Sequence, residues 1–103
     1  MAGKVNILWT KPAIMEFAEI LYLLRSRSTE AASKVVSQMR STVLLLSQFP
    51  EMRERLELEW RPAHHIVVDQ YRIFYDYIRT ENKVLILAIF DLHQNPHRIF
   101  SLN

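Results

Sequence analysis

The sequence predicts a single α+β domain in which a helical hairpin packs on a small, mainly antiparallel four-stranded sheet. Three observations predict it: an alternating apolar segment near the start, two long segments with helical spacing of apolar residues, and three β-rich segments in the second half. A run of helices before a run of strands is typical of α+β folds. The 103 residues, half of them hydrophobic and 23% charged, suffice for one core, so we expect residues 1–103 to form one domain.

A strand and then a helix are expected at the start of the chain. Val5, Ile7 and Trp9 alternate on one face of a strand, Thr10 can cap the helix that follows, and Pro12 suits its first turn. The apolar stripe of this helix is expected to comprise Ile14, Phe17, Ala18, Leu21 and Leu24. The two acidic side chains that fall outside the stripe are Glu16 and Glu19.

A second helix is expected to begin at Ser28 or Thr29 and to end at Phe49–Pro50, since the residue before a proline disfavours the α region. Its stripe comprises Ala32, Val35, Val36, Met39, Val43 and Leu46. Two helices joined by about three residues must lie antiparallel. The hairpin therefore needs a flat apolar surface to cover.

Three strands in the second half supply that surface. The segments 64–68, 71–78 and 83–90 are rich in Ile, Val, Tyr and Phe, and short polar loops separate them. We expect an antiparallel meander, with the first strand of the chain joining its edge. Residues 51–63 are compatible with either a short solvated helix or a loop.

Composition excludes several classes of function. The chain has no Cys and one Gly, which rules out disulfide scaffolds, thiolate metal sites, P-loops and Rossmann fingerprints. It has no run of about 20 apolar residues and no apolar signal core, so a cytoplasmic protein without membrane contact is expected. A net charge of +2 is too small to support stable binding of nucleic acid by electrostatics alone.

The histidines predict no metal site. Neighbouring His64 and His65 point to opposite faces of a strand, and Pro96 interrupts the helical spacing of His93 and His97. We therefore expect neither a metal nor another cofactor. The serines lie in no glycine-flanked elbow, so a serine hydrolase is not indicated.

Arg72 is the strongest candidate for a binding residue. It lies in the predicted central strand, on the face opposite Tyr71, Ile73, Tyr75 and Tyr77. Because Asp76 shares the face of Arg72, we expect this face to be the wetter one. The cations that could converge there as a rim for phosphate or carboxylate groups are Arg61, His64, Arg72, His93 and Arg98. The alternative is an ion pair of Arg72 with Asp76 or Asp91. The tyrosines could stack bases, but core packing is the more common use of such residues.

The order of elements resembles that of the RelE/ParE toxin superfamily of bacterial toxin–antitoxin modules. The resemblance covers about residues 5–100 and includes specific phrases of sequence. These are Ile7-Leu8-Trp9-Thr10-Lys11-Pro12-Ala13, Leu46-Ser47-Gln48-Phe49-Pro50, Tyr71-Arg72-Ile73-Phe74-Tyr75 and Ile89-Phe90-Asp91-Leu92-His93-Gln94-Asn95-Pro96. The implied fold is β-α-α-β-β-β.

The superfamily implies two alternative activities. RelE-like members cut messenger RNA in the ribosomal A site, whereas ParE-like members poison DNA gyrase, and a small antitoxin wraps and silences either kind. Arg72 matches an Arg of the central strand that both branches carry. Where a RelE-like nuclease ends in a catalytic Tyr, this chain has Phe100, which cannot transfer a proton. Arg72 and His93 would be catalytic only in a RelE-like enzyme.

The resemblance thus implies the toxin of a type II toxin–antitoxin, or plasmid stabilisation, module of the ParE-like branch. We expect it to inhibit gyrase through Arg61, His64, Arg72, His93 and Arg98, and to form a hetero-oligomer with its antitoxin. On this reading it is not an enzyme. The alternatives are a ribosome-dependent messenger endoribonuclease, whose partners would be the ribosome and mRNA, and a non-toxic binding relic of the fold.

Overall fold

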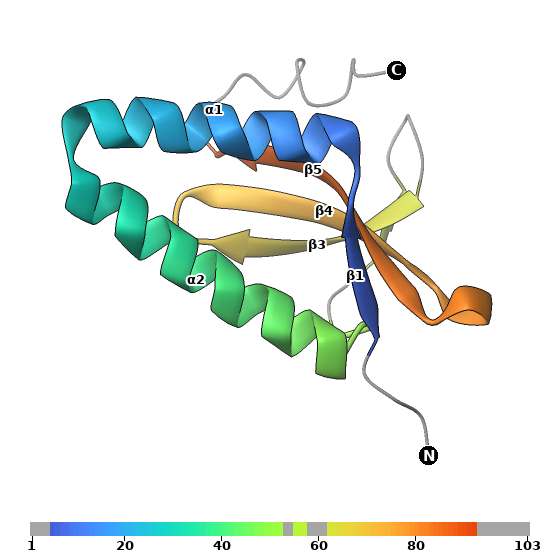
Figure 1. Cartoon of the computed structure of the whole chain (residues 1–103). Coiled ribbons are helices and arrows are strands. Elements are labelled where there is room, and N and C mark those ends of the chain that lie inside the picture. The colour runs from blue at the N-terminus through green and yellow to red at the C-terminus, as the bar shows by residue number, and fades with distance from the viewer. Residues whose placement is uncertain (1–4, 53–54, 58–61, 93–103) are drawn as a thin grey trace.

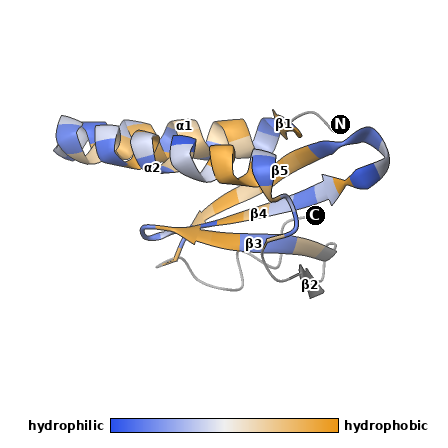
Figure 2. Ribbon diagram, turned by 90° about the horizontal axis from the view of Figure 1, so that it is seen from below, coloured by the Kyte–Doolittle hydropathy of each residue, from blue (hydrophilic) through white to orange (hydrophobic). Residues whose placement is uncertain are grey.

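The computed structural model describes residues 5–52, 55–57 and 62–92. The elements are β1 (Asn6–Trp9), α1 (Lys11–Arg27), α2 (Thr29–Gln48), β2 (Arg55–Glu57), β3 (Pro62–Val68), β4 (Tyr71–Ile78), a 3₁₀ turn (Arg79–Glu81) and β5 (Lys83–Asp91). The helices form a hairpin over one face of the sheet, so the molecule has two layers (Figures 1 and 2). This arrangement confirms the predicted α+β fold.

The sheet is mixed, with the strand order β1-β5-β4-β3-β2. β3, β4 and β5 form the predicted antiparallel meander, and β1 lies parallel to β5 at one edge, with Leu8 opposite Leu85. The three-residue strand β2 pairs with β3 and adds a fifth strand at the other edge. It comes from the segment 51–63, whose shape the sequence left open between a helix and a loop.

Both helices begin at the predicted hydroxyl caps. The Thr10 Oγ1 atom accepts a hydrogen bond from the Ala13 N–H at 3.4 Å, and the Ser28 Oγ atom accepts one from the Ala31 N–H at 3.1 Å. Ser28 also ends α1, because its own N–H donates to the Leu24 carbonyl. One residue therefore closes one helix and starts the next, which forces the tight hairpin.

The buried face of α1 differs from the predicted stripe. Ile14 is 54% exposed and Ala18 does not belong to the core, so the stripe is rotated from the expected one. The side chains of α1 in the core cluster are Ala13, Phe17, Ile20 and Leu24. These positions follow helical spacing as well as the predicted ones do, because α1 is apolar on most of its circumference. The predicted stripe of α2 agrees more closely with the structure. Its buried members are Ala32, Val35, Met39 and Leu46, as expected.

Two apolar clusters lie on the two faces of the sheet. The cluster on the helical face joins the helix side chains to Ile66, Val68, Tyr71, Ile73, Tyr75, Val84, Ile86 and Ile89. The cluster on the opposite face comprises Ala63, Phe74, Leu87, Ala88 and Phe90. A bulge in β5 makes both possible, because Phe74 pairs with Ala88 while Tyr75 pairs with Ile86. The extra residue, Leu87, interrupts the alternation of faces along β5, so the consecutive residues Leu87 and Ala88 both belong to the cluster on the opposite face.

Candidate functional site

Arg72 lies on the sheet face that the helices do not cover. Its neighbours in β4, Tyr71 and Ile73, belong to the core under the helices, so Arg72 points to the opposite face. The residues paired with it across the sheet are Val67 on β3 and Phe90 on β5. The structure thus confirms which face of β4 packs on the helices.

The surroundings of Arg72 are less exposed to solvent than predicted. Phe90 is 6% exposed and Phe74 is 1% exposed, and their rings meet edge to face at 5.9 Å. The Arg72 side chain is partly exposed, and its Nε atom is buried without a hydrogen-bond acceptor among the described residues. Within the described ranges Arg72 forms no ion pair, so the alternative pairing with Asp76 or Asp91 is not observed.

This geometry suits anion binding better than acid–base chemistry. A guanidinium group has five N–H donors in a planar fork that matches a phosphate or carboxylate. An apolar surround strengthens such a charge-assisted bond because it lowers the local dielectric. The cross-strand partners Val67 and Phe90 cannot transfer a proton.

The structure does not bring His64 together with Arg72. His64 pairs with Tyr75 and stacks on its ring at a centroid distance of 5.2 Å, and it is buried on the helical face. His65 shares the face of Arg72 instead, because it pairs with Phe74. The expectation that His64 joins a rim around Arg72 is therefore wrong, because the two side chains lie on opposite faces of the sheet. The other predicted members, Arg61, His93 and Arg98, lie outside the described residues.

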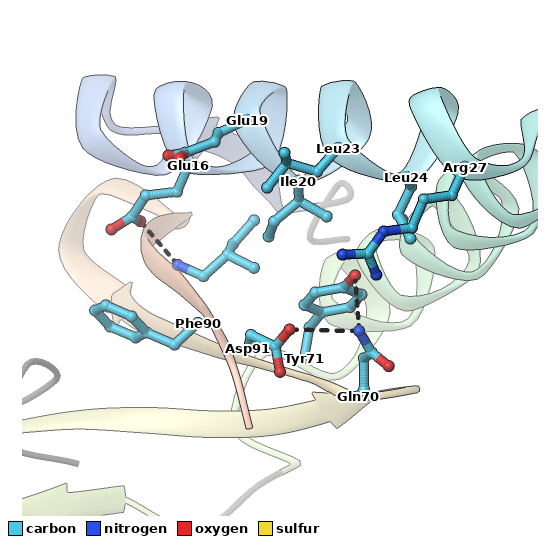
Figure 3. Close-up of a pocket in the computed structure, with 11 residues that line it drawn as sticks. Glu16, Glu19, Ile20, Leu23, Leu24, Arg27, Gln70, Tyr71, Phe90 and Asp91 are labelled. Atoms are coloured by element: carbon cyan, nitrogen blue, oxygen red, sulfur yellow. Dashed lines mark hydrogen bonds between the residues drawn. The ribbon is translucent and has the colours of Figure 1, made fainter. Parts of the chain in front are cut away.

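A cavity of about 310 Å³ between α1 and β5 was not predicted from the sequence (Figure 3). Its apolar lining comprises Ile20, Leu23, Leu24, Ile89 and Phe90. Its polar lining comprises Glu16, Glu19, Arg27, Gln70, Tyr71 and Asp91. The groups therefore come from one helix and from the end of the sheet where β4 and β5 meet.

Glu16 connects the helix to the sheet at one end of this cavity. Its Oε1 atom accepts a hydrogen bond from the Ile89 N–H at 2.9 Å. Burial raises the pKa of the Glu16 carboxyl, and the charge of Glu19 raises it further, whereas the bond from Ile89 opposes the change. Glu16 is thus a carboxylate that pays a desolvation cost and has a like charge beside it.

The opposite end of the cavity holds a small polar network. The Gln70 Nε2 atom donates to the Tyr71 hydroxyl at 3.1 Å and to the Asp91 Oδ2 atom at 3.4 Å (Figure 3). Burial raises the pKa of Tyr71, and the charges of Asp91 and Asp69 add to the increase, whereas the Gln70 bond and Arg27 oppose it. The ring of Tyr71 forms part of the core, and its hydroxyl reaches the cavity.

Two kinds of feature are absent from the part of the chain that the structure describes. It contains no group of three or more His, Cys, Asp or Glu side chains placed to hold a metal ion. No helix within it is both long and apolar enough to cross a membrane.

Comparison with known proteins identified a family that matches the chain. Residues 7–96 match the family model described as the ParE toxin of the type II toxin–antitoxin system, parDE. The match spans most of the chain, from within β1 to beyond the end of β5. No curated protein matches the chain.

Proposed function

Because the chain belongs to the ParE toxin family of type II toxin–antitoxin systems, we propose that it inhibits DNA gyrase and that a cognate antitoxin neutralises it. The resemblance described above associates the ParE-like branch with gyrase and the RelE-like branch with messenger cleavage. The proposed action is cytoplasmic, and it would stabilise a plasmid that carries the module.

The placement of Arg72 is the observation that supports this proposal most. Its guanidinium belongs to the middle of the sheet, on the face free of helices, and no acid within the described ranges pairs with it. A cation in this position is available to an anionic group of a macromolecule. The residues paired with it across the sheet, Val67 and Phe90, are apolar and supply neither an acid nor a base.

Exposed apolar side chains on the helices support the antitoxin as partner. On the outer side of α1, Met15 is 61% exposed and Tyr22 is 75% exposed. Further exposed apolar residues at the end of the hairpin are Leu44, Leu45, Phe49 and Met52. Such surfaces on a small protein indicate an interaction site. A flexible antitoxin segment that folds on binding would cover them.

A supercoiling assay with purified gyrase tests the proposal. We expect the chain to inhibit supercoiling and to leave cleaved DNA in a gyrase-dependent manner, and the purified antitoxin to abolish both effects. A reaction with topoisomerase I is the control for a general effect on DNA. Cutting of messenger on translating ribosomes, with gyrase unaffected, would contradict the proposal and favour the endoribonuclease. Growth without harm in cells that lack the antitoxin would favour the non-toxic relic.

A further inference from the structure

Two carboxylates at one end of the cavity under α1 have no cation beside them among the described residues. Glu16 and Glu19 are three residues apart, so they lie on one side of the helix. Neither forms an ion pair with any residue that the structure describes. Glu19 raises the pKa of Glu16, which shows that the two charges act on each other. Among the residues that the structure describes, this end of the cavity therefore carries negative charge that no ion pair compensates.

The other end of the cavity is closer to electrical balance. The guanidinium of Arg27 points toward Tyr71 and Gln70 (Figure 3). Asp91 also lies at this end of the cavity, where it accepts a hydrogen bond from Gln70. Arg27 and Asp91 shift the pKa of Tyr71 in opposite directions, so both charges reach the same hydroxyl. The described lining of the cavity contains three acidic groups and one basic group, and the excess is at Glu16 and Glu19.

Between these two ends the cavity wall is apolar. Ile20 and Leu23 line it from the helix, and Ile89 and Phe90 line it from β5. Leu23 is 51% exposed, so the cavity is accessible from outside. An apolar wall that leads to a pair of carboxylates suits one kind of side chain, a hydrocarbon stem with a cationic end. The volume of about 310 Å³ can hold such a side chain.

We propose that this cavity receives a Lys or Arg side chain of the antitoxin, with the cationic end between Glu16 and Glu19 and the stem on Ile20 and Phe90. The identity of the partner rests on the proposed function, whereas the chemistry of the site rests on the cavity alone. A cation there would offset the cost of the partly buried Glu16 carboxylate. The hydrogen bond from Ile89 would hold that carboxylate in place.

Titration of the ¹⁵N-labelled chain with N-acetyl-arginine N-methylamide tests the site by NMR. We expect a saturable shift of the Ile89 amide signal with a dissociation constant of about 1–10 mM. The same derivative of norleucine, which keeps an apolar stem without the charge, is expected to produce no such shift. Absence of saturation up to about 50 mM would overturn the proposal, as would equal shifts with norleucine.

Variants with matched loss of charge localise the effect. Glu16→Gln and Glu19→Gln should each weaken binding of the arginine derivative about three- to fivefold. The amide introduced by Glu16→Gln still offers an oxygen to the Ile89 N–H, so the fold is retained. The control is Glu30→Gln, an exposed residue in the first turn of α2 and outside the cavity. An equal effect of Glu30→Gln would show general charge attraction and overturn the site.

The purified complex with the antitoxin tests the source of the side chain. The arginine derivative should no longer bind, because the antitoxin occupies the cavity. Continued binding would overturn the antitoxin as occupant. The titration of the free chain uses neither gyrase nor antitoxin, so it can contradict the cavity site without contradicting gyrase inhibition, and the reverse. Binding with gyrase unaffected would remove the proposed function and keep the site, whereas gyrase inhibition without binding would remove this inference alone.

Discussion

The Glu16 carboxylate on α1 accepts a hydrogen bond from the Ile89 N–H on β5, although the two residues are 73 positions apart. β1 pairs with β5 only as far as Trp9 opposite Ile86. Beyond that point a side chain of α1, and not a strand, binds the backbone of β5. Glu16 thus satisfies the N–H of Ile89 at the open edge of the sheet and connects α1 to β5.

Removing this acceptor should destabilise the fold. In Glu16→Ala the N–H of Ile89, a residue 2% exposed, would lose its partner. We expect the free energy of unfolding to fall by about 1–3 kcal/mol. Glu16→Gln keeps an acceptor oxygen and should stay within about 1 kcal/mol of the parent chain. Urea denaturation measures both, and equal stability of the alanine variant would contradict a structural role for this bond.

The raised pKa of Glu16 predicts a specific pH dependence of stability. In the window just above the ordinary value of 4.5, the folded chain binds more protons at this site than the unfolded chain does. The contribution of Glu16 is therefore fully present below that value and is lost as pH rises through the folded pKa. Unfolding of the parent relative to Glu16→Gln at several pH values measures it. A relative stability that rises with pH in this window would contradict the predicted direction.

Glu19 should influence that titration. Its charge raises the pKa of Glu16, so Glu19→Gln should lower the Glu16 pKa toward the ordinary value. NMR titration of the Glu16 side-chain carbon reports the pKa directly. Glu30→Gln, which lies on α2 outside the cavity, is the control and should leave the value unchanged. No change in Glu19→Gln would show that the two carboxylates do not interact.

Thr10 should contribute to stability through the hydrogen bonds of its hydroxyl group. Its hydroxyl caps α1 and donates to the Ile86 carbonyl at 2.9 Å. Thr10→Val keeps the shape but removes the hydroxyl, so we expect a loss of about 1–2 kcal/mol. Thr10→Ser retains the hydroxyl and should lose less than about 0.5 kcal/mol. Thermal and urea unfolding would distinguish them, and similar losses in both variants would argue against the hydroxyl.

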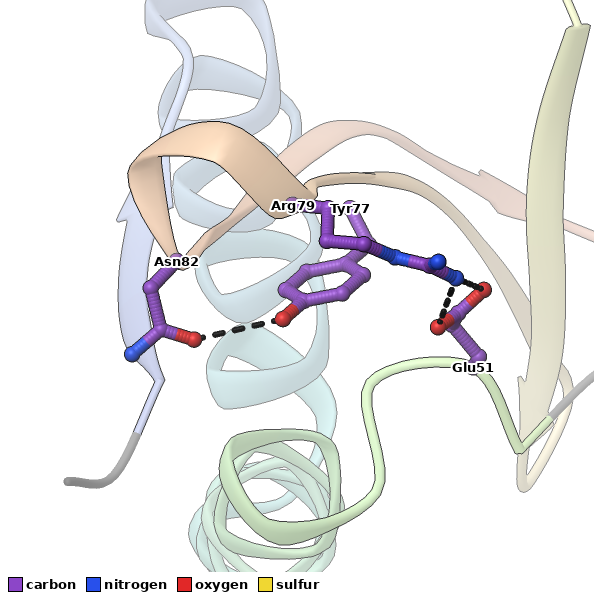
Figure 4. Close-up of polar contacts among 4 residues, drawn as sticks. All are labelled: Glu51, Tyr77, Arg79 and Asn82. Atoms are coloured by element: carbon purple, nitrogen blue, oxygen red, sulfur yellow. Dashed lines mark hydrogen bonds and ion pairs between the residues drawn. The ribbon is translucent and has the colours of Figure 1, made fainter. Parts of the chain in front are cut away.

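The ion pair between Arg79 and Glu51 should contribute little, despite its geometry (Figure 4). The Arg79 Nη2 atom lies 2.7 and 2.8 Å from the two carboxylate oxygens, but the side chains are 75% and 50% exposed. A double-mutant cycle should give a coupling of about 0.2–1 kcal/mol that decreases with added salt. A coupling above about 2 kcal/mol would show that this pair fixes the segment after α2 to the 3₁₀ turn.

The parts of the fold that depend on local chemistry were predictable from the sequence. Thr10 and Ser28 are hydroxyl residues at the start of apolar helical periods, and both prove to be caps. Asp69 and Asn82, in the predicted loops, adopt positive φ angles of 56° and 50°, which these residue types tolerate. Period-two alternation likewise placed Arg72 opposite the tyrosines.

The parts that depend on tertiary packing were not predictable. α1 is apolar on most sides, so its sequence could not decide between Ile14 and Ala13 as the buried position. β5 is apolar without interruption from Val84 to Phe90, so no alternation revealed the bulge at Leu87. The cavity beside Glu16 depends on where β1 stops along β5, a relation between segments that no local pattern encodes. The register of β3 against β4, which places His64 and Arg72 on opposite faces of the sheet, likewise depends on tertiary packing.

The central claim is that the chain acts on gyrase through the sheet face that carries Arg72, and a dose series in the supercoiling assay tests it most directly. Arg40→Ala, which removes an exposed arginine from α2, is the matched control. We predict inhibition by the parent chain and by Arg40→Ala at similar concentrations, and a requirement for at least about tenfold more of a correctly folded Arg72→Ala. Supercoiling that continues unchanged at a large molar excess of the parent chain would contradict the account.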